Sequence, residues 1–256
     1  MKVKFLGTHN AESKYTKLVS LLIDDILAVD TGSLTSELSF SEQEKIKAIL
    51  LSHGHYDHIR DVPAFAFNNA CRTTKVFGTP ETLEILSSHL VDGVIYPKFT
   101  EKTPICEKQS LQLVTLEPFI PVDIEGYQVL ALPVNHPGSS VGFEITSKND
   151  KKIFYSGDTN VGLSDIWEHI SPQLIIMEVT FPNKLENVAK NSSHLCPKML
   201  KKELKEFHRI KGYYPRIILI HLTPNYKKEI KREIKEVAKE LKLSIDIPSD
   251  GEEIIV

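Results

Sequence analysis

The sequence predicts an α/β (α+β) protein in which two β-sheets pack face to face between outer helices, a four-layer αββα sandwich. Two observations support this fold class. In each half of the 256-residue chain, short strand-like runs come first and units of one strand and one helix follow them, an order that suits two sheets covered by helices. Neither an internal repeat nor a low-complexity linker divides the chain. Residues 1–256 are therefore expected to form a single domain.

The first half is predicted to begin with strands and to continue with short helices. Apolar or alternating runs typical of strands are Val3–Leu6, Leu18–Ile23, Ile26–Asp30, Ile46–Ser52 and Lys75–Thr79. A short helix is expected from Ser41, which fits the capping position. A second is expected over Pro63–Asn69, where proline opens the helix. Leucines at helical spacing predict a third helix over Pro80–Leu90.

The segment Val91–Lys108 interrupts this pattern. It contains Pro97 and Pro104 among several polar residues, so we expect a long excursion rather than part of the core. Long loops in compact domains are often functional.

The second half is richer in strands. Short apolar runs broken by Gly, Pro, Asn or Asp predict strands over Leu111–Leu116, Ile120–Ile124, Gln128–Leu132, Val141–Thr146, Lys152–Ser156, Leu174–Val179 and Ile217–Ile220. Helical patterns cover Leu163–His169, Lys198–Arg209 and Glu229–Leu241. Ile245–Ile247 and Glu253–Val256 are expected to be edge strands.

Composition is that of an ordinary globular protein, with 41% hydrophobic and 25% charged residues and a formal net charge of −3. That charge gives no general attraction to nucleic acid or anionic membrane. The interleaved Lys and Glu of Lys198–Lys211 and Lys227–Lys242 fit solvated helix faces. The three cysteines are widely spaced and suggest no disulfide framework. With no apolar stretch of transmembrane length, a cytoplasmic protein is expected.

The six residues His53-Gly54-His55-Tyr56-Asp57-His58 follow the apolar run Ile46–Ser52. In an extended or turning backbone, His53 and His55 point the same way, while Asp57 and His58 can turn toward a second point a short distance away. One short loop could therefore supply ligands to two metal ions. The alternative is a polar loop with surface histidines. Four such residues at this spacing favour the metal site.

The partners of this loop are sought where other apolar strands end, because rigid strands position loop residues well. His136, Asp158 and His221 each follow a predicted strand. Each alone could be an ordinary polar residue, but the three share one context. Together with the histidine loop they predict a two-metal site.

Two further residues are candidates near this site. Asp30 ends a strand and could orient a ligating imidazole by accepting its other N–H, or it could form a turn with Thr31 and Gly32. His194 precedes a helix and could be a helix-entry residue without a function. His9 lies in the first loop and could line a cleft, whereas His89, His169 and His208 are expected at the surface.

The histidine loop, followed in order by His136, Asp158 and His221, resembles the metallo-β-lactamase fold superfamily over nearly the whole chain. The resemblance implies a metallo-β-lactamase-like sandwich in which His53, His55 and His136 hold one metal. Asp57, His58 and His221 would hold the other, and Asp158 would bridge them. Asp30 matches the superfamily's early Asp at a strand end.

Three stretches are similar to class II cyclic-nucleotide phosphodiesterases within that superfamily. They are Leu90–Phe99, His194-Leu195-Cys196-Pro197, and His221-Leu222-Thr223-Pro224. One departure is Ile59-Arg60-Asp61-Val62-Pro63, where that family usually has Gly-Gly or Gly-Ser. The tRNA 3′-end processing endonuclease is a similar neighbour, but this chain has no Gly-rich basic arm like the one that grips tRNA in that family.

These features predict a metal-dependent hydrolase with two divalent ions, zinc first and manganese or iron as alternatives. A metal-bridging hydroxide would attack a small phosphodiester such as a 3′,5′-cyclic nucleotide. Asp57 and His194 are the expected catalytic residues, with His194 donating a proton to the leaving oxygen.

The substrate would be covered by Tyr96, Lys98 and Phe99, although the same segment could instead mediate dimer contact. A homodimer without membrane attachment is expected. An RNA- or DNA-processing nuclease is the second possibility, and hydrolysis of a thioester, lactone or β-lactam is the third.

Overall fold

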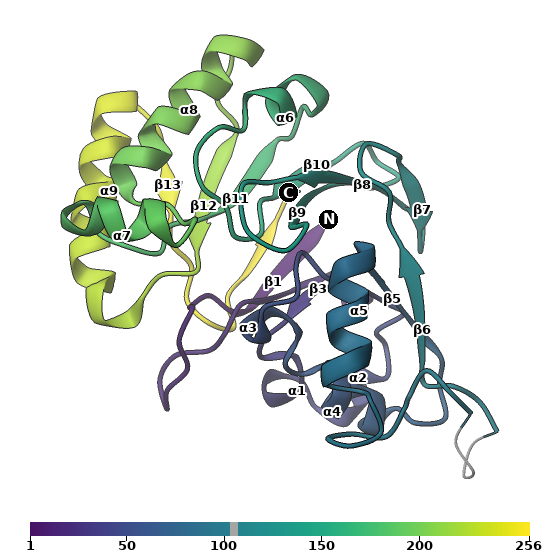
Figure 1. Cartoon of the computed structure of the whole chain (residues 1–256). Coiled ribbons are helices and arrows are strands. Elements are labelled where there is room, and N and C mark those ends of the chain that lie inside the picture. Colours follow the sequence, from purple (N-terminus) through teal and green to yellow (C-terminus); the bar gives the residue numbers. More distant parts are fainter. Residues whose placement is uncertain (103–106) are drawn as a thin grey trace.

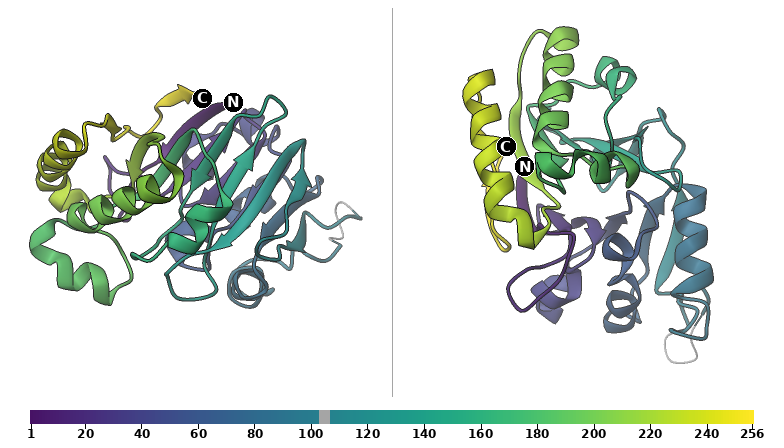
Figure 2. Two further views of the ribbon diagram at one scale, coloured as in Figure 1. Left: turned by 90° about the horizontal axis from the view of Figure 1, so that it is seen from above. Right: turned by 60° about the vertical axis from the view of Figure 1, so that its left-hand side comes forward.

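The computed structural model describes residues 1–102 and 107–256. Within them the chain forms two seven-stranded sheets that pack face to face between two layers of helices (Figures 1 and 2). The predicted four-layer αββα sandwich is therefore confirmed. The single domain over residues 1–256 stays a prediction.

The first sheet has the strand order β14-β1-β2-β3-β4-β5-β6. Its strands are β1 (Lys2–Gly7), β2 (Ser20–Ile23), β3 (Leu27–Thr31), β4 (Ala48–Leu50), β5 (Thr74–Gly78), β6 (Leu111–Thr115) and β14 (Glu253–Ile255). Strands β3 to β6 are mutually parallel. Their carboxyl ends consequently lie at one edge of the sheet.

The second sheet has the order β13-β12-β11-β10-β9-β8-β7. Its strands are β7 (Val122–Ile124), β8 (Tyr127–Pro133), β9 (Val141–Thr146), β10 (Lys152–Tyr155), β11 (Leu174–Glu178), β12 (Arg216–Ile220) and β13 (Ile245–Asp246). Strands β10 to β13 are parallel, and β8 runs in the same direction because it is antiparallel to β9, which is antiparallel to β10.

Helices cover the outer face of each sheet (Figure 1). The first sheet carries α1 (Leu34–Glu37), α2 (Phe40–Gln43), α3 (Tyr56–Ile59), α4 (Val62–Asn68) and α5 (Pro80–His89). The second carries α6 (Ser164–His169), α7 (Glu186–Asn191), α8 (Pro197–Lys211) and α9 (Lys227–Leu241), with short 3₁₀ turns at Asn183–Leu185 and Pro224–Tyr226.

Three hydrophobic clusters fill the three interfaces between these four layers. Side chains alternate across each strand, so Leu50 enters the cluster between the sheets while Ile49 enters the cluster beneath the first helical layer. In the same way Ile218 faces the other sheet and Leu219 faces the second helical layer. Burial on both faces explains why these strands are continuous apolar runs in the sequence.

Several sequence expectations need correction. The helix expected from Ser41 begins earlier, because Ser39 is its cap: the Ser39 Oγ accepts from the Glu42 N–H, and the Glu42 Oε2 accepts from the Ser39 N–H at 2.8 Å. Helices α1, α3 and α7 were not predicted. Cys71 is disulfide-bonded, which the wide cysteine spacing did not suggest.

The excursion expected over residues 91–108 leaves the end of α5 and returns to the start of β6, and its residues 103–106 lie outside the described residues. In the described part of the chain, no helix combines the length and the apolar character needed to cross a membrane.

Candidate metal centre

The polar residues predicted from strand ends meet at one edge of the sandwich. His53 follows β4, whereas His136, Asp158 and His221 follow β8, β10 and β12. Because β4 is parallel to its neighbours in the first sheet, and β8, β10 and β12 run one way in the second, their carboxyl ends can deliver these side chains to one place. Loops at such strand ends are usual positions for ligand-binding residues.

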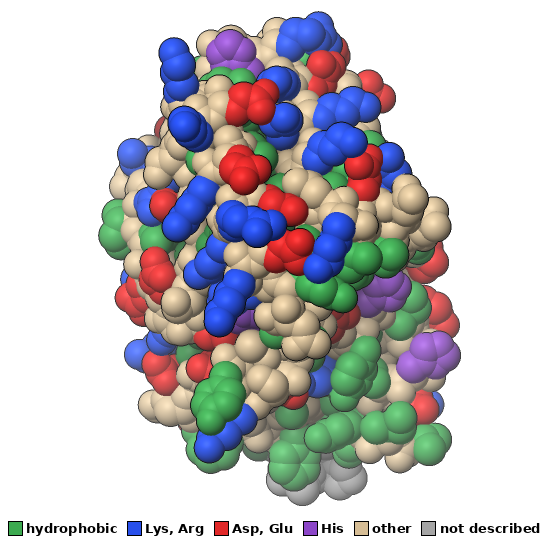
Figure 3. All heavy atoms as spheres, turned by 90° about the vertical axis from the view of Figure 1, so that its left-hand side faces the viewer, with side chains coloured by type: hydrophobic (Ala, Val, Ile, Leu, Met, Phe, Trp, Pro, Cys, Tyr) green, Lys and Arg blue, Asp and Glu red, His purple; other side chains and the backbone are tan. Residues whose placement is uncertain are grey.

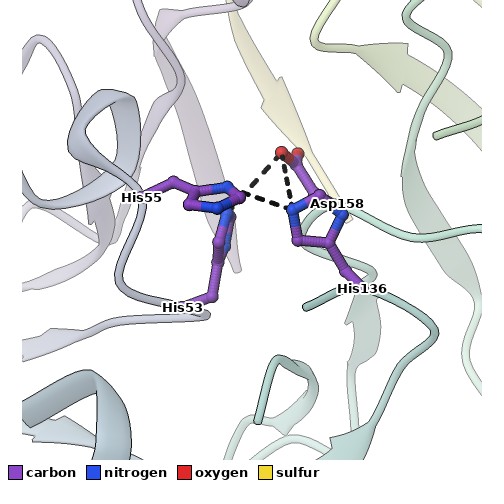
Figure 4. A group of neighbouring side chains, drawn as sticks. All are labelled: His53, His55, His136 and Asp158. Carbon is purple, nitrogen blue, oxygen red and sulfur yellow. Dashed lines mark hydrogen bonds and ion pairs between the residues drawn. The ribbon is translucent and has the colours of Figure 1, made fainter. Parts of the chain in front are cut away.

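One group of donor atoms comes from His53, His55, His136 and Asp158 (Figure 4). The His55 Nδ1 lies 3.1 Å from the His136 Nε2. The Asp158 Oδ2 lies 3.7 Å from the His53 Nε2 and 4.0 Å from the His136 Nε2. All four donor atoms lie within 4.8 Å of one another.

A second group comes from Asp57, His58, His221 and the same Asp158. The His221 Nε2 lies 3.3 Å from the Asp57 Oδ2 and 3.3 Å from the Asp158 Oδ2. The His58 Nε2 lies 3.3 Å from the Asp158 Oδ2. The expected split of the loop is therefore present, with His53 and His55 in one group and Asp57 and His58 in the other.

The donor set fits divalent metal ions. His53 Nε2, His58 Nε2 and Asp158 Oδ1 are buried and have no hydrogen-bond partner among the described residues. Buried polar atoms are normally hydrogen-bonded, so three unpaired ones converging on one point indicate a ligand. Imidazole nitrogen with carboxylate oxygen suits zinc, and also manganese or iron.

Asp30 contacts one of these imidazoles directly and a second one through Ser52. Its Oδ2 lies 2.7 Å from the His58 Nδ1 and accepts the Ser52 hydroxyl at 2.7 Å and the Tyr155 hydroxyl. Since a carboxylate only accepts, His58 donates from Nδ1, and its Nε2 is the ring nitrogen that lies beside the Asp158 carboxylate. The Ser52 Oγ in turn lies 3.0 Å from the His53 Nδ1, which fixes that ring in the same way.

The electrostatics favour neutral imidazoles in the first group and ionised carboxylates in the shared position. Burial lowers the pKa of His53 well below its usual value and also lowers the pKa of His55 and His136. Burial alone would raise the pKa of Asp158, but the surrounding His221 and His58 outweigh it and hold that pKa well below its usual range. In His58, burial is outweighed by Asp158 and Asp30, which raise its pKa well above normal.

Glu178 is a site residue to which the sequence analysis gave no role. It is the last residue of β11 and is buried. Its Oε2 accepts the Thr180 hydroxyl at 2.7 Å, and the Thr180 Oγ1 lies 2.7 Å from the His221 Nδ1. The Thr180 hydroxyl, which donates to Glu178, therefore accepts a hydrogen bond from the His221 Nδ1–H, and the His221 Nε2 faces the centre. The strand-end rule that selected Asp158 would also have selected Glu178.

Glu178 also holds His194 against both donor groups. The Glu178 Oε1 lies 2.7 Å from the His194 Nδ1. The His194 ring stacks on His221 with centroids 5.2 Å apart and lies 5.0 Å from the His136 centroid. Burial opposes protonation of this ring, but the Glu178 charge and hydrogen bond outweigh it and raise the pKa of His194 to about 9.

Three residues expected to contact substrate are not brought to this site. Tyr96, Lys98 and Phe99 lie beyond the end of α5, where the Phe99 carbonyl accepts from the Leu111 N–H at the start of β6. That is the sheet edge opposite the donor groups. Phe99 is buried in the core, and Lys98 pairs with Glu101 at 3.6 Å.

Residues 25–222 match a family model described as a beta-lactamase superfamily domain. The chain belongs to this superfamily. The matched segment includes every member of the two donor groups. The resemblance to the metallo-β-lactamase superfamily that the histidine loop indicated is therefore confirmed.

Curated relatives of this superfamily member carry hydrolase names. A 3′,5′-cyclic-nucleotide phosphodiesterase of Aliivibrio fischeri is 24% identical over 205 residues, which span 73% of this chain and 61%, less than two thirds, of the relative. The probable metallo-hydrolase YhfI of Bacillus subtilis is 27% identical over 187 residues, 71% of this chain and 73% of the relative. These names agree with the expectation of a metal-dependent hydrolase.

Solved structures show the same fold. The YhfI crystal structure has a TM-score of 0.76 at 20% identity and covers 99% of this chain and 98% of its own. Unliganded yeast PDE1 has a TM-score of 0.84 at 17% identity, covering 100% of this chain and 99% of its own.

In this superfamily member a cavity of about 380 Å³ lies beside the first donor group. His136 forms part of its wall, together with Pro80, Pro118, Pro133 and Val134. The cavity's serine hydroxyls are already paired, Ser139 with Glu81 and Ser140 with the Pro137 carbonyl. Its free surface is consequently mainly apolar.

Proposed function

We propose that this chain is a metal-dependent hydrolase that cleaves a small phosphodiester, represented by a 3′,5′-cyclic nucleotide. The observation that carries the proposal is the pair of donor groups sharing Asp158, with the Glu178-anchored His194 stacked on His221 and tilted against His136. The Aliivibrio fischeri relative named as a phosphodiesterase supports the substrate class.

In the proposed centre, His53, His55 and His136 would hold one divalent ion, and Asp57, His58 and His221 would hold another. Asp158 belongs to both donor groups. When bound, the two ions supply Lewis acidity to water and to the phosphoryl oxygens. Zinc is the first choice for these donors, with manganese or iron as alternatives.

His194 is proposed as the general acid. Its Nδ1 faces the Glu178 carboxylate, so the ring keeps a proton there and can carry a second on Nε2. The Nε2 proton would pass to the departing sugar oxygen as the phosphorus–oxygen bond breaks. Glu178 would stabilise the charged ring before that transfer.

Asp57 is proposed to orient the attacking water. Its side chain is 27% exposed, whereas that of Asp158 is 3% exposed. Asp57 is therefore the centre's carboxylate that solvent reaches. The apolar cavity beside His136 is proposed to receive the base of the nucleotide, a role that the sequence analysis gave to Tyr96, Lys98 and Phe99.

One experiment tests the proposal directly. Wild-type protein with zinc or manganese is assayed on cyclic mononucleotides, cyclic dinucleotides, bis-p-nitrophenyl phosphate and pre-tRNA. Asp158→Ala should lose most bound metal and essentially all turnover. His194→Ala should keep its metal and lose a factor of about one hundred or more in kcat. No turnover of any small diester in this panel by the metal-loaded protein would refute the proposal.

A nuclease is the second candidate because the charges are unevenly distributed. Residues 184–242 hold 16 Lys or Arg and 7 Asp or Glu, a surplus of nine positive charges in a chain of net charge −3. Figure 3 shows this face, over α7 to α9, with many basic side chains and interspersed acidic ones. A cavity of about 820 Å³ runs along α8 beside Gly162, close in sequence to Asp158.

Many of these cations already have acidic partners, such as Lys201 and Lys205 on Glu240, both at 2.8 Å. The cyclic nucleotide therefore stays the first candidate. Pre-tRNA cleavage with an affinity that falls steeply with salt would favour the nuclease. A homodimer and a cytoplasmic location stay predictions from the sequence, and light scattering tests the first.

A further inference from the structure

The backbone of His221 adopts a conformation that needs external support. His221 has φ +64° and is buried. Residues with a β-carbon rarely adopt this left-handed region. The strained turn comes immediately after β12 and sets the direction in which the imidazole leaves the strand.

The support comes from the first loop of the chain. The Thr8 carbonyl accepts from the His221 N–H at 2.6 Å and lies 3.3 Å from the Leu222 nitrogen, whose N–H also points to it. His9 forms isolated β-bridges with Leu222 and with Leu18. The backbone of the first loop therefore holds the His221 turn through hydrogen bonds.

A second segment fixes that loop from the other side. The Thr8 hydroxyl donates to the Asp250 Oδ1 at 2.7 Å, and the Asp250 Oδ2 accepts from the Lys17 N–H at 3.1 Å. The His9 Nδ1 lies 3.4 Å from the Asp250 Oδ1. Thr8 and His9 are both buried, so water cannot easily replace these contacts.

Lys227 completes the arrangement at the start of α9. Its Nζ lies 3.0 Å from the His9 Nε2. Because an ammonium group only donates, the His9 Nε2 accepts and its proton is on Nδ1, where it faces Asp250 and Thr8. His9 is thus a buried connector between two chain segments, not a cleft residue.

We propose that Thr8, His9 and Asp250 are positioning residues that hold His221 in the second donor group. The three lie outside residues 25–222, the segment that matches the superfamily model. The inference rests on the metal centre of the proposed function. In this inference Asp250, which is far in sequence from the histidine loop, helps to position one member of the second donor group.

The test measures zinc binding by wild type and variants in competition with a chromophoric chelator. Asp250→Ala and Thr8→Val should each weaken one zinc equivalent about 10- to 100-fold, the usual effect of losing an outer support. The other equivalent should be unchanged. Thr8→Ser keeps the hydroxyl and should bind like wild type. The double variant should bind zinc no more weakly than the single variant with the lower affinity, because both substitutions remove the same Thr8–Asp250 hydrogen bond.

Asp246→Ala is the matched control. Asp246 lies four residues earlier and pairs with Arg216 at 3.1 Å on the surface. Its loss should leave both zinc equivalents intact. A general loss of packing would weaken both equivalents together and would contradict the proposal. If Asp250→Ala does not fold, Thr8→Val still decides, since it removes one hydroxyl with little change in shape.

The outcomes separate this inference from the proposed function. Two zinc equivalents with wild-type affinity in Asp250→Ala and Thr8→Val overturn the positioning role and leave the hydrolase proposal standing. If the two variants each weaken one zinc equivalent but the wild-type protein cleaves no diester, the positioning role is supported and the proposed function is refuted. A wild-type protein that binds no divalent metal refutes both.

Discussion

The Asp30 carboxylate accepts hydrogen bonds from residues of both sheets. Ser52 and His58 reach it from the first sheet, and Tyr155 reaches it from the second. Its own φ is +53°, in the left-handed region that residues with a β-carbon rarely adopt. One buried acid therefore fixes the orientation of His58 directly and of His53 through Ser52.

Asp30→Asn should weaken metal binding about 10- to 100-fold. The amide has one accepting oxygen, so its NH₂ must face a donor, either the Ser52 N–H or the His58 N–H. This mismatch should also cost about 1–3 kcal/mol of unfolding free energy. Zinc competition and urea unfolding measure the two effects.

Asp24→Asn is the control for that variant. Asp24 accepts the Tyr127 hydroxyl at 2.6 Å and the Lys2 N–H at 2.7 Å, away from the centre. It should lose stability and keep its metal affinity. Equal metal affinity in Asp30→Asn and Asp24→Asn would show that Asp30 has no orienting role.

The sequence was sufficient for the donor groups because each member follows an apolar run that ends at a loop. Asp158 and His221 could be placed by that rule without knowing the register of either sheet. Glu178 satisfies the same rule but was hidden inside a run taken as wholly apolar. The role of Thr8 could not be predicted, since it depends on a backbone contact across more than two hundred residues.

At the scale of elements, the direction of α5 decides what its following segment can reach. Strand β5 ends at the edge that carries the donor groups, and α5 then returns the chain to the opposite edge, where β6 starts (Figure 1). Parallel neighbours require such a crossover. The segment with Tyr96 and Phe99 therefore lies far from the centre, which residue types alone did not reveal.

Helix α8 stabilises the loop that follows Asp158 through the buried Glu203. Its carboxylate accepts from the Gly162 N–H at 2.8 Å, the Leu163 N–H at 3.2 Å and the Trp167 Nε1–H at 3.3 Å. Glu203→Ala leaves these three donors unpaired, and each of the two buried ones, from Leu163 and Trp167, costs about 1–3 kcal/mol. We expect an unfolding free energy lower by about 2 kcal/mol or more.

Glu206→Ala on the same helix provides the comparison. Glu206 pairs with Arg209 at the surface at 2.7 Å, and surface changes of this kind usually shift stability by about 0.5 kcal/mol or less. Urea unfolding of both variants tests the difference. A Glu203→Ala variant as stable as Glu206→Ala would mean that the loop does not depend on this carboxylate.

At the scale of the whole molecule, each donor group takes residues from both sheets. His53 and His55 meet His136 and Asp158, and Asp57 and His58 meet Asp158 and His221. Bound metal would link the two halves of the sandwich. A ligand at a thousand times its dissociation constant stabilises the folded state by about 4 kcal/mol.

Chelation should therefore lower the melting temperature by roughly 10 °C, since 1 kcal/mol corresponds to about 2–4 °C in a protein of this size. Scanning calorimetry with and without EDTA measures the change, and added zinc should restore it. Magnesium serves as the control, because imidazole donors suit it poorly. An unchanged melting temperature in metal-loaded and chelated protein would argue against a link between the sheets.

The position of β14 sets the order in which the structure can form. Strand β1 pairs with β14 in the register Lys2↔Ile255, so the first sheet receives its last strand from the far end of the chain. The second donor group likewise waits for His221. Contacts this distant in sequence make folding slow. A ribosome-bound chain could not complete the second donor group until His221 has emerged, so the ion held there would load late.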